Sequence, residues 1–413
     1  MKTPIDIEIP MSLPQHPWHP SVVYVQEGWN GHMCWMAQTP YPPFHVAPYK
    51  DRWELPCILY SNDGVRWKSI ETNPIDNLTE EQIASHSYHS DPHLVMKEGV
   101  LYCYYRLMEN HDARTTIIRK KSRDGVKWSE REIITLEETK TEKNTVPAIN
   151  TNKEDEVIKN AESLDTCSIL NSIDHQFARE QAPGQPNAQS YTIDSVAQTL
   201  SNDSFRKNVD CINCEKSEKN NHAGSREIIS PAVVWTGEKW RMYYVDDTYT
   251  NLQRGMQMAE SEDGIHFKVI GSVWDQQEVK PWHIDVQLIE GVYYMLVHDV
   301  DDNSLWLYTS KEGMHFGEGK EILRASGKLT DYWSHKLYRA CLVNVEGKNH
   351  IYFSANDGMA SYIGLIVEEE QGKYTIVDCM HGSRKAEFVV LYWSRRIMQF
   401  KQRVIHFIEK RIK

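Results

Sequence analysis

The sequence predicts an all-β protein, a five-bladed β-propeller with a long irregular insertion and a C-terminal amphipathic helix. Three repeated features predict this fold: a Ser-x-Asp-Gly turn, an apolar strand, and an aromatic-rich strand that follows each apolar one. The expected domain boundaries are 1–136 and 227–382 for the propeller, 137–226 for the insertion and 383–413 for the helix. The 413 residues are 40% hydrophobic, which is enough to fill the core of a fold of this size.

The turn motif joins a short apolar or alternating run to an outer strand. It occurs at Ser61–Trp67, Ser122–Trp128, Ser261–Phe267 and Ser310–Phe316. Asp-Gly favours the backbone of a tight turn, and the Ser and Asp side chains can bond the turn backbone. The aromatic residue three positions after Gly then packs on the next strand. Asp63, Asp124 and Asp263 are therefore assigned to turn structure.

An apolar run precedes each repeat of the aromatic strand. The five runs begin at Pro20, Pro92, Pro231, Asp285 and Ala340. An acidic turn that contains Gly follows each run, and the aromatic-rich strand comes next. Five copies of this four-stranded unit predict a five-bladed propeller. The N-terminal segment 5–10 can supply the outer strand that closes the last blade and removes an open edge.

The interval between Asp124 and Asp263 is too long for a single blade. The excess, 137–226, is rich in Asn, Ser, Lys, Glu and Gln and contains few aromatic residues. We expect a poorly ordered insertion rather than a separate domain, because little apolar surface is available to bury. It holds Cys211 and Cys214, the only tight pair among eight cysteines, which we expect to be mostly reduced, buried thiols.

The C-terminal segment has the spacing of an amphipathic helix. Trp393, Ile397, Phe400 and Val404 recur at helical intervals, and seven Lys or Arg stand against one Glu from Arg395 onward. Two arrangements fit this pattern. The helix could contact an anionic membrane surface through 389–413, or it could dock on the acidic propeller wall.

Composition excludes several classes of protein. A net charge of −12 argues against nucleic-acid binding, and no run approaches the roughly 20 apolar residues of a membrane helix. The N-terminus lacks the apolar segment of a secretory signal. The expected location is the cytoplasm, with a peripheral position at the inner membrane face if the C-terminal helix contacts lipid.

Candidate site residues are those at the ends of the inner strands, which meet at one mouth of a propeller channel. The candidate catalytic residues are Asp91, Asp285, Glu227 and His19. The candidate substrate-binding residues are Trp18, His89, His93, His283, Trp282, Arg339 and Trp333. Two carboxyl groups can act as acid and base on a glycosidic bond, and indoles can stack on sugar rings. A buried Asp285 should have a partner such as His283 or Arg339.

The turns and the Ser90-Asp91-Pro92 segment resemble those of five-bladed β-propeller glycoside hydrolases of families 43, 32, 68, 62, 117 and 130, over about Pro14 to Asp378. The resemblance implies an enzyme that cleaves or transfers glycosyl units of an oligo- or polysaccharide. It implies no cofactor and no catalytic metal; a structural calcium ion is implied by the resemblance alone. Of three acidic roles in family 43, Asp91 matches one. The other two fall on His19 and Ile229, with Glu227 two positions before Ile229.

Two functions from different classes follow. The first is a glycoside hydrolase or a related glycosyl-transferring enzyme. The second is a catalytically inactive glycan-binding propeller in surface-polysaccharide metabolism, which the residues His19 and Ile229 favour. A protein-interaction scaffold is a weaker third reading, because it needs no funnel of charged and aromatic groups.

Overall fold

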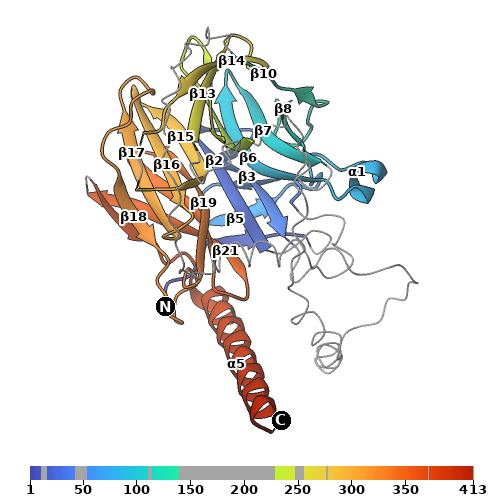
Figure 1. Cartoon of the computed structure of the whole chain (residues 1–413), viewed down its shortest axis with the longest axis vertical. Coiled ribbons are helices and arrows are strands. Elements are labelled where there is room, and N and C mark those ends of the chain that lie inside the picture. Colours follow the sequence, from blue (N-terminus) through green and yellow to red (C-terminus); the bar gives the residue numbers. More distant parts are fainter. Residues whose placement is uncertain are drawn as a thin grey trace, which may run out of the picture. The chain divides into compact units, whose positions relative to one another are not determined.

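The computed structural model describes residues 1–10, 16–41, 54–109, 114–138, 228–246, 255–275, 278–370 and 372–412. Five sheets follow one another along the described chain, as the sequence predicts (Figure 1). The all-β propeller with five blades is therefore confirmed. The insertion lies outside the described residues except for its first two, which end a strand.

Each blade contains four antiparallel strands in the order of the sequence. Blade one has β2 (His16–Trp29), β3 (His32–Tyr41), β4 (Cys57–Ser61) and β5 (Arg66–Ser69); blade two has β6 (Tyr88–Lys97), β7 (Val100–Glu109), β8 (Arg114–Ser122) and β9 (Glu132–Ile133). Blade three has β11 (Ile228–Trp235), β12 (Trp240–Asp246), β13 (Gly255–Ser261) and β14 (His266–Ser272); blade four has β15 (Pro281–Ile289), β16 (Val292–Asp299), β17 (Ser304–Ser310) and β18 (Lys320–Arg324). Blade five has β19 (Lys336–Val345), β20 (Lys348–Asn356), β21 (Ser361–Glu370) and β22 (Lys373–Ile376). A short helix, α1 (Glu80–Ala84), precedes blade two.

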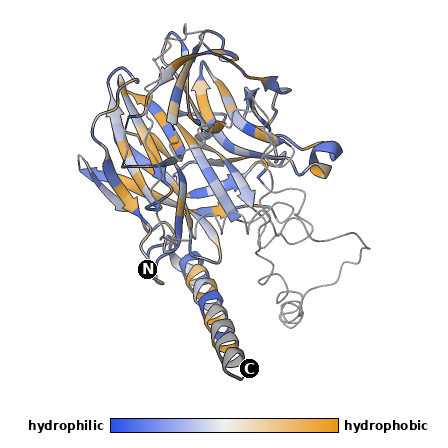
Figure 2. Ribbon diagram, in the orientation of Figure 1, coloured by the Kyte–Doolittle hydropathy of each residue, from blue (hydrophilic) through white to orange (hydrophobic). Residues whose placement is uncertain are grey.

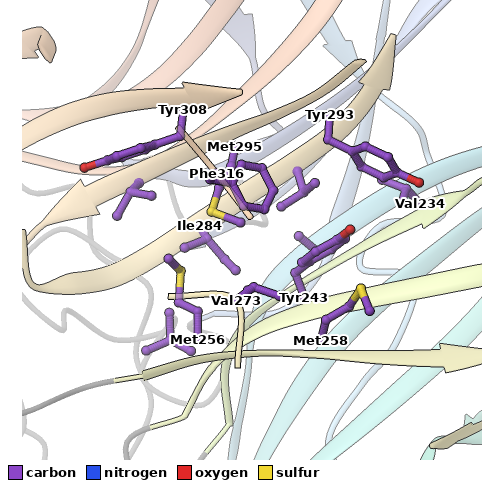
Figure 3. Packing of buried hydrophobic residues seen from close by; sticks show 14 of the residues in the cluster. Val234, Tyr243, Met256, Met258, Val273, Ile284, Tyr293, Met295, Tyr308 and Phe316 are labelled. Atoms are coloured by element: carbon purple, nitrogen blue, oxygen red, sulfur yellow. The ribbon is translucent and has the colours of Figure 1, made fainter. Parts of the chain in front are cut away.

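The blades form a closed ring. The innermost strands contact one another in the order β2, β6, β11, β15, β19 and back to β2. Five apolar clusters fill the five gaps between adjacent blades, including the gap between blades five and one. Figure 3 shows the cluster between blades three and four, where Val234 and Tyr243 pack near Ile284 and Met295. Burial of these large side chains is the main force that holds the ring together.

The Ser-x-Asp-Gly turns have the predicted hydrogen bonds. In blade one, the Ser61 hydroxyl accepts the N–H of Gly64 at 3.0 Å, and Asp63 Oδ1 accepts the N–H groups of Val65 and Arg66. The other three turns repeat the bond from the glycine N–H to the serine hydroxyl. The assignment of Asp63 and its equivalents to turn structure is confirmed.

An aromatic side chain from the preceding blade docks on each of these turns. Tyr104 donates to the carbonyl of Gly264, Tyr243 to Gly313, and Tyr352 of blade five to Gly64 of blade one. In blade two, the ring of Trp35 lies so close to Gly125 that an added Cβ would approach it to 2.2 Å. These turn glycines therefore serve two needs, a positive φ and a close approach between blades.

The N-terminal strand is placed differently from the prediction. β1 (Asp6–Glu8) does not complete blade five; it pairs in parallel with β5, the outer strand of blade one. Blade five has its own outer strand, β22. The N-terminal segment nevertheless bridges the two blades, because Ile5 N–H donates to the carbonyl of Ile363 and the Thr3 hydroxyl donates to Asp378. Apolar packing and these bonds, rather than a shared sheet, therefore join blade five to blade one.

Blade three gains an extra strand in the same way. β10 (Thr135–Glu138) leaves blade two directly after β9 and pairs in parallel with β14, the outer strand of blade three. A fifth strand thus covers an outer edge in two of the five blades, and an exposed edge is where a sheet would otherwise pair with another chain.

The C-terminal segment forms helix α5 (Gly382–Ile412), as predicted. Its first turns pack on blade five through the buried side chains of Phe388 and Tyr392. Among the described residues, no helix is both long and apolar enough to cross a membrane. Five cysteines are described, all of them free and buried as expected; Cys211 and Cys214 lie outside the described residues.

Candidate active site

The inner strands of all five blades break register near one end. The breaks fall between Trp18 and Ser21, Ser90 and His93, Ile229 and Ala232, Pro281 and His283, and Leu337 and Ala340. In three blades a residue other than glycine adopts a left-handed backbone at the break and precedes a proline: His19, Asp91 and Ser230, with φ between 51° and 55°. Asp and His tolerate this conformation better than most residues, but it is still strained. Such strain at buried polar residues is typical of a functional site.

Three of these inner-strand residues form a compact cluster. His283 Nδ1 lies 3.1 Å from Asp91 Oδ1, and His19 Nε2 lies 3.6 Å from the same oxygen. All three side chains are buried, with at most 2% of each exposed. The sequence predicts that all three lie near the ends of the inner strands at one mouth, and the structure brings them together.

Neighbouring residues fix the orientation of the cluster. Arg106 Nε forms an ion pair with Asp91 Oδ2 at 2.7 Å, and the N–H of Ser230 donates to the same oxygen. On the other side, His19 Nδ1 lies 2.6 Å from the hydroxyl of Thr39. These contacts hold one oxygen of Asp91 and one nitrogen of His19, which leaves Oδ1 and Nε2 directed at the centre of the cluster.

Burial and charge set the protonation states. Burial disfavours the charged carboxylate of Asp91, but Arg106 and the two imidazoles outweigh it and hold the pKa well below its ordinary value. Burial lowers the pKa of His283 to about 4, although the carboxylate of Asp91 opposes this, and burial also lowers the pKa of His19 well below its ordinary value. At neutral pH the cluster therefore contains one anion and two neutral imidazoles.

This donor set fits a metal ion. One potential ligand atom from each of His19, Asp91 and His283 lies within 4.8 Å of the other two. Two ligand atoms that each lie about 2.1 Å from one tetrahedral zinc ion are about 3.4 Å apart, close to the 3.1 and 3.6 Å observed. Two of the atoms that face this point, His19 Nε2 and Asp91 Oδ1, are buried without a hydrogen-bond partner, which is costly unless another group satisfies them, and His283 Nδ1 is the third atom that faces it. Two imidazoles and one carboxylate suit a transition metal better than calcium, which prefers oxygen ligands.

Aromatic side chains lie beside the cluster. The ring of Tyr338 is 4.1 Å from that of His283 and 5.2 Å from that of Trp18. Trp282 Nε1 donates to the Tyr338 hydroxyl at 2.9 Å. All three are partly exposed, in contrast to the cluster itself. Partly exposed rings of this kind are suitable surfaces for a sugar ring.

Asp285 is engaged elsewhere. It pairs with His93 Nδ1 at 3.2 Å, and its Oδ2 accepts the N–H of Leu342 at 3.0 Å. The ion-pair partner is thus His93 of blade two rather than the expected His283, which lies two residues away on the same strand and points along the same face. The expected Arg339 attracts Asp285, but the direct contact is with His93. These bonds make Asp285 a link between blades.

Arg339 is fully buried and lies between the two carboxylates. Its Nη1 is 3.8 Å from Asp91 Oδ1, and its Nη2 donates to the carbonyl of Pro231 at 3.5 Å. Burial lowers its pKa, against the attraction of Asp91 and Asp285. Arg339 therefore belongs to the wall of the site.

The remaining candidates lie apart from the cluster. His89 is buried 3.4 Å from Asp76, and its pKa is lowered by burial to about 3. Trp333 packs into the apolar cluster between blades four and five, against Tyr332. Glu227 lies outside the described residues.

Three residues of the site were not among the candidates. Thr39 and Arg106 lie on the second strands of their blades, and Tyr338 directly precedes Arg339. Arg106 follows a run of aromatic residues in β7. A charged residue within an apolar strand could have indicated a buried ion pair. Tyr338 directly precedes Arg339, as the candidate Trp18 directly precedes His19, and this equivalent position could have identified it. Nothing in the sequence distinguishes Thr39.

The fold and site together define a five-bladed propeller of the kind found in carbohydrate-active enzymes. No family model matches the chain. The chain is 23% identical over 366 residues to an A type blood N-acetyl-α-D-galactosamine deacetylase of Flavonifractor plautii. The aligned region covers 82% of this chain and 38% of that protein. The chain thus spans about two fifths of the length of this relative.

Two solved structures show the same fold. An N-acetylgalactosamine deacetylase from F. plautii, in complex with blood group B trisaccharide, matches with a TM-score of 0.55 and 18% identity, over 89% of this chain and 94% of that one. An exo-β-1,3-galactanase from Phanerochaete chrysosporium, with β-1,3-galactotriose, matches with a TM-score of 0.51 and 7% identity, over 91% and 66%. The resemblance to propeller glycoside hydrolases is confirmed at the level of fold, which a sugar deacetylase shares.

Proposed function

We propose that this protein is a metal-dependent N-deacetylase that removes the acetyl group from an N-acetylated amino sugar of a glycan. The observation that carries the proposal is the buried cluster of His19, Asp91 and His283, in which a single carboxylate oxygen and two neutral imidazoles face one point. The similarity to the F. plautii deacetylase supports the same chemistry.

The cluster suits this reaction better than glycosidic cleavage. Glycosidases use two carboxyl groups on opposite sides of the scissile bond, about 5 to 9.5 Å apart. Here Asp91 directs Oδ1 at the two imidazoles of the cluster, whereas both oxygens of Asp285 are bonded to His93, Leu342 and Gln287. Glu227, the third acidic candidate, lies outside the described residues, so the assay below also includes glycosidic substrates.

Hydrolysis of the acetamide adds water across its C–N bond and releases acetate and the free amine of the sugar. A divalent ion held by His19, Asp91 and His283 would supply a Lewis acid and lower the pKa of a bound water. The chain supplies the correct ligand states, since Asp91 is anionic and both imidazoles are neutral near pH 7. Tyr338 and Trp18 lie where a sugar ring could stack beside the cluster.

The test combines a metal analysis with two assays. Purified protein should contain about one divalent metal ion per chain by elemental analysis, and it should release acetate from oligosaccharides that end in N-acetylgalactosamine or N-acetylglucosamine. Removal of the metal with a chelator should abolish this activity, and one transition metal should restore it.

Other outcomes contradict the proposal in distinct ways. Nitrophenol release from aryl glycosides that is lost in Asp285→Asn would support a glycosidase. Saturable binding of sugar with no turnover, with or without metal, would support a glycan-binding propeller. Full metal occupancy in a variant that lacks both imidazoles would show that the ion binds elsewhere.

A further inference from the structure

Helix α5 contacts blade five through one side of its first turns. The Tyr392 hydroxyl lies 2.8 Å from the carbonyl of Leu329, and Phe388 packs against Tyr362. Arg396 donates to the hydroxyl of Ser334 at 3.0 Å, and Arg395 donates to the hydroxyl of Tyr362 at 3.2 Å. Together these contacts fix the first turns of the helix against blade five.

The opposite side of α5 is apolar and exposed. Its residues recur three or four positions apart, the spacing of one helix face. They are Val390, Trp393, Ile397, Phe400 and Val404, and Leu391, Met398 and Ile405 widen the face on one flank. Between 39% and 69% of each side chain is exposed to solvent. Figure 2 shows hydrophobic and hydrophilic colours alternating along α5. Exposed Ser394 and Lys401 lie between the two rows of apolar side chains. An exposed apolar surface of this length that is bordered by polar residues is typical of a binding site.

The charge of the helix indicates what this face binds. Seven Lys or Arg and one Glu lie between Arg395 and Lys413, whereas the whole chain carries −12. A basic helix with an exposed apolar face fits an anionic lipid surface, where lipid headgroups attract the cations and the acyl boundary receives the apolar side chains. Because Arg395 and Arg396 contact blade five, the cations from Lys401 onward are the ones that meet such a surface, while the acidic propeller body is repelled by it.

The width of the apolar face favours lipid over a second copy of the helix. A two-stranded coiled coil buries a narrow seam, which Val390, Trp393, Ile397, Phe400 and Val404 would form by themselves. The flank of Leu391, Met398 and Ile405 extends the face to about half of the helix circumference. A coiled coil would leave that flank in water, whereas a membrane interface covers it.

We propose that helix α5 binds the surface of anionic membranes through this face. The proposal does not depend on the deacetylase activity, because the face lies on an element that contributes no residue to the metal cluster.

The experiment is flotation of the full-length protein with lipid vesicles. The protein should float with vesicles of phosphatidylcholine and phosphatidylglycerol and should bind vesicles of phosphatidylcholine alone at least about tenfold more weakly. Salt at about 1 M, where the Debye length is about 3 Å, should weaken the binding. The variant Ile397→Asp with Phe400→Asp should bind at least about tenfold more weakly than the wild type.

A matched control is Ile133→Asp with Ile270→Asp, which changes two exposed apolar residues on the blades and should leave flotation unchanged. Circular dichroism and acetate release from both variants report whether the propeller is intact. Failure of the wild type to float with anionic vesicles, or equal flotation of the two double variants, would overturn the proposal. It would also be overturned if the wild type sediments as a dimer that Ile397→Asp with Phe400→Asp dissociates, while neither protein floats.

Discussion

The Ser-x-Asp-Gly turns and the channel mouth both recur from blade to blade. The turns conserve side chains and backbone alike, whereas the mouth conserves the backbone alone. At the turns, both the residues and their contacts recur: a serine hydroxyl accepts the glycine N–H, and an aromatic side chain of the preceding blade covers the glycine. At the mouth, only the backbone recurs, as a break in the register of each inner strand. The side chains there differ in every blade, and three of them, His19, Asp91 and Arg339, have buried polar atoms without a hydrogen-bond partner.

This difference separates the two roles of the repeat. Residues that recur together with their hydrogen bonds are explained by folding, because each blade needs the same turn and the same docking surface. Burying a polar side chain lowers the stability of the fold unless the group is hydrogen-bonded. The mouth residues differ between equivalent positions, so the repeated blade structure does not explain why they are there. Their presence at the mouth is therefore explained by chemistry, and variants in the two regions should behave differently.

The largest expected effect is at the mouth. Asp91→Asn removes the single carboxylate of the cluster while keeping its shape, so acetate release should fall by about 10³-fold and the bound metal should be lost. The same change at a turn, Asp63→Asn, should leave acetate release within about twofold, because the amide oxygen can still accept the turn N–H groups. Steady-state assays and elemental analysis measure both. Equal loss of activity in the two variants would remove the distinction between the regions.

The next effect is at a turn. Gly125→Ala would place a Cβ 2.2 Å from the ring of Trp35 at a residue with φ of 75°, so the free energy of unfolding should fall by about 3 kcal/mol or more. The metal content of the folded fraction should be unchanged. Denaturant unfolding monitored by circular dichroism tests this prediction, with the exposed Gly99→Ala, whose added Cβ meets no atom within 4 Å, as a control for the backbone alone.

A smaller effect is expected behind the cluster. Thr39→Val keeps the shape of the side chain but removes the hydroxyl 2.6 Å from His19 Nδ1, and the metal should bind about 10- to 100-fold more weakly. Excess metal should restore acetate release in this variant, which distinguishes lost orientation from lost catalysis. Unchanged metal affinity would show that Thr39 has no part in holding His19.

The smallest effect at neutral pH concerns His89. Burial lowers its folded pKa to about 3, below the value of about 6.5 in the unfolded chain, so the unfolded state binds the extra proton between these values. The stability that His89 contributes is therefore complete above about pH 6.5 and is lost as the pH falls toward 3, at no more than about 1.4 kcal/mol per pH unit. In His89→Gln the acid-side slope should be shallower, as measured by urea unfolding at several pH values. Parallel slopes for wild type and variant would contradict it.

The features that repeat were predictable from the sequence. The turns gave the number of blades because their spacing and chemistry are local, and Asp91, His19 and His283 were found together because the inner strands of a ring converge. The partner of Asp285 was not predictable, since His93 approaches it from another blade, and that contact depends on how the strands face each other. The position of β1 was also missed, because Ile5 and Ile7 can cover either of two neighbouring edges.

The proposed metal site was not predicted from the sequence, for a different reason. Its residues were read as acids, bases and sugar contacts, since the resemblance concerned glycoside hydrolases, and a ligand set of two histidines and one aspartate from three blades has no spacing to recognise. Trp333 illustrates the opposite error. It lies a few residues before the inner strand of blade five in the sequence, yet its side chain packs in the apolar cluster between blades four and five.

The left-handed residue before a proline in blades one, two and three gives the mouth a modular character. His19, Asp91 and Ser230 occupy the same backbone geometry, and Ser230 Oγ already lies 3.3 Å from His283 Nδ1. Because the main chain at these positions is preset, exchanging one short polar side chain for another changes the donor set without rebuilding a loop. The ring therefore offers three positions of the same backbone geometry at which different polar side chains can face one shared space.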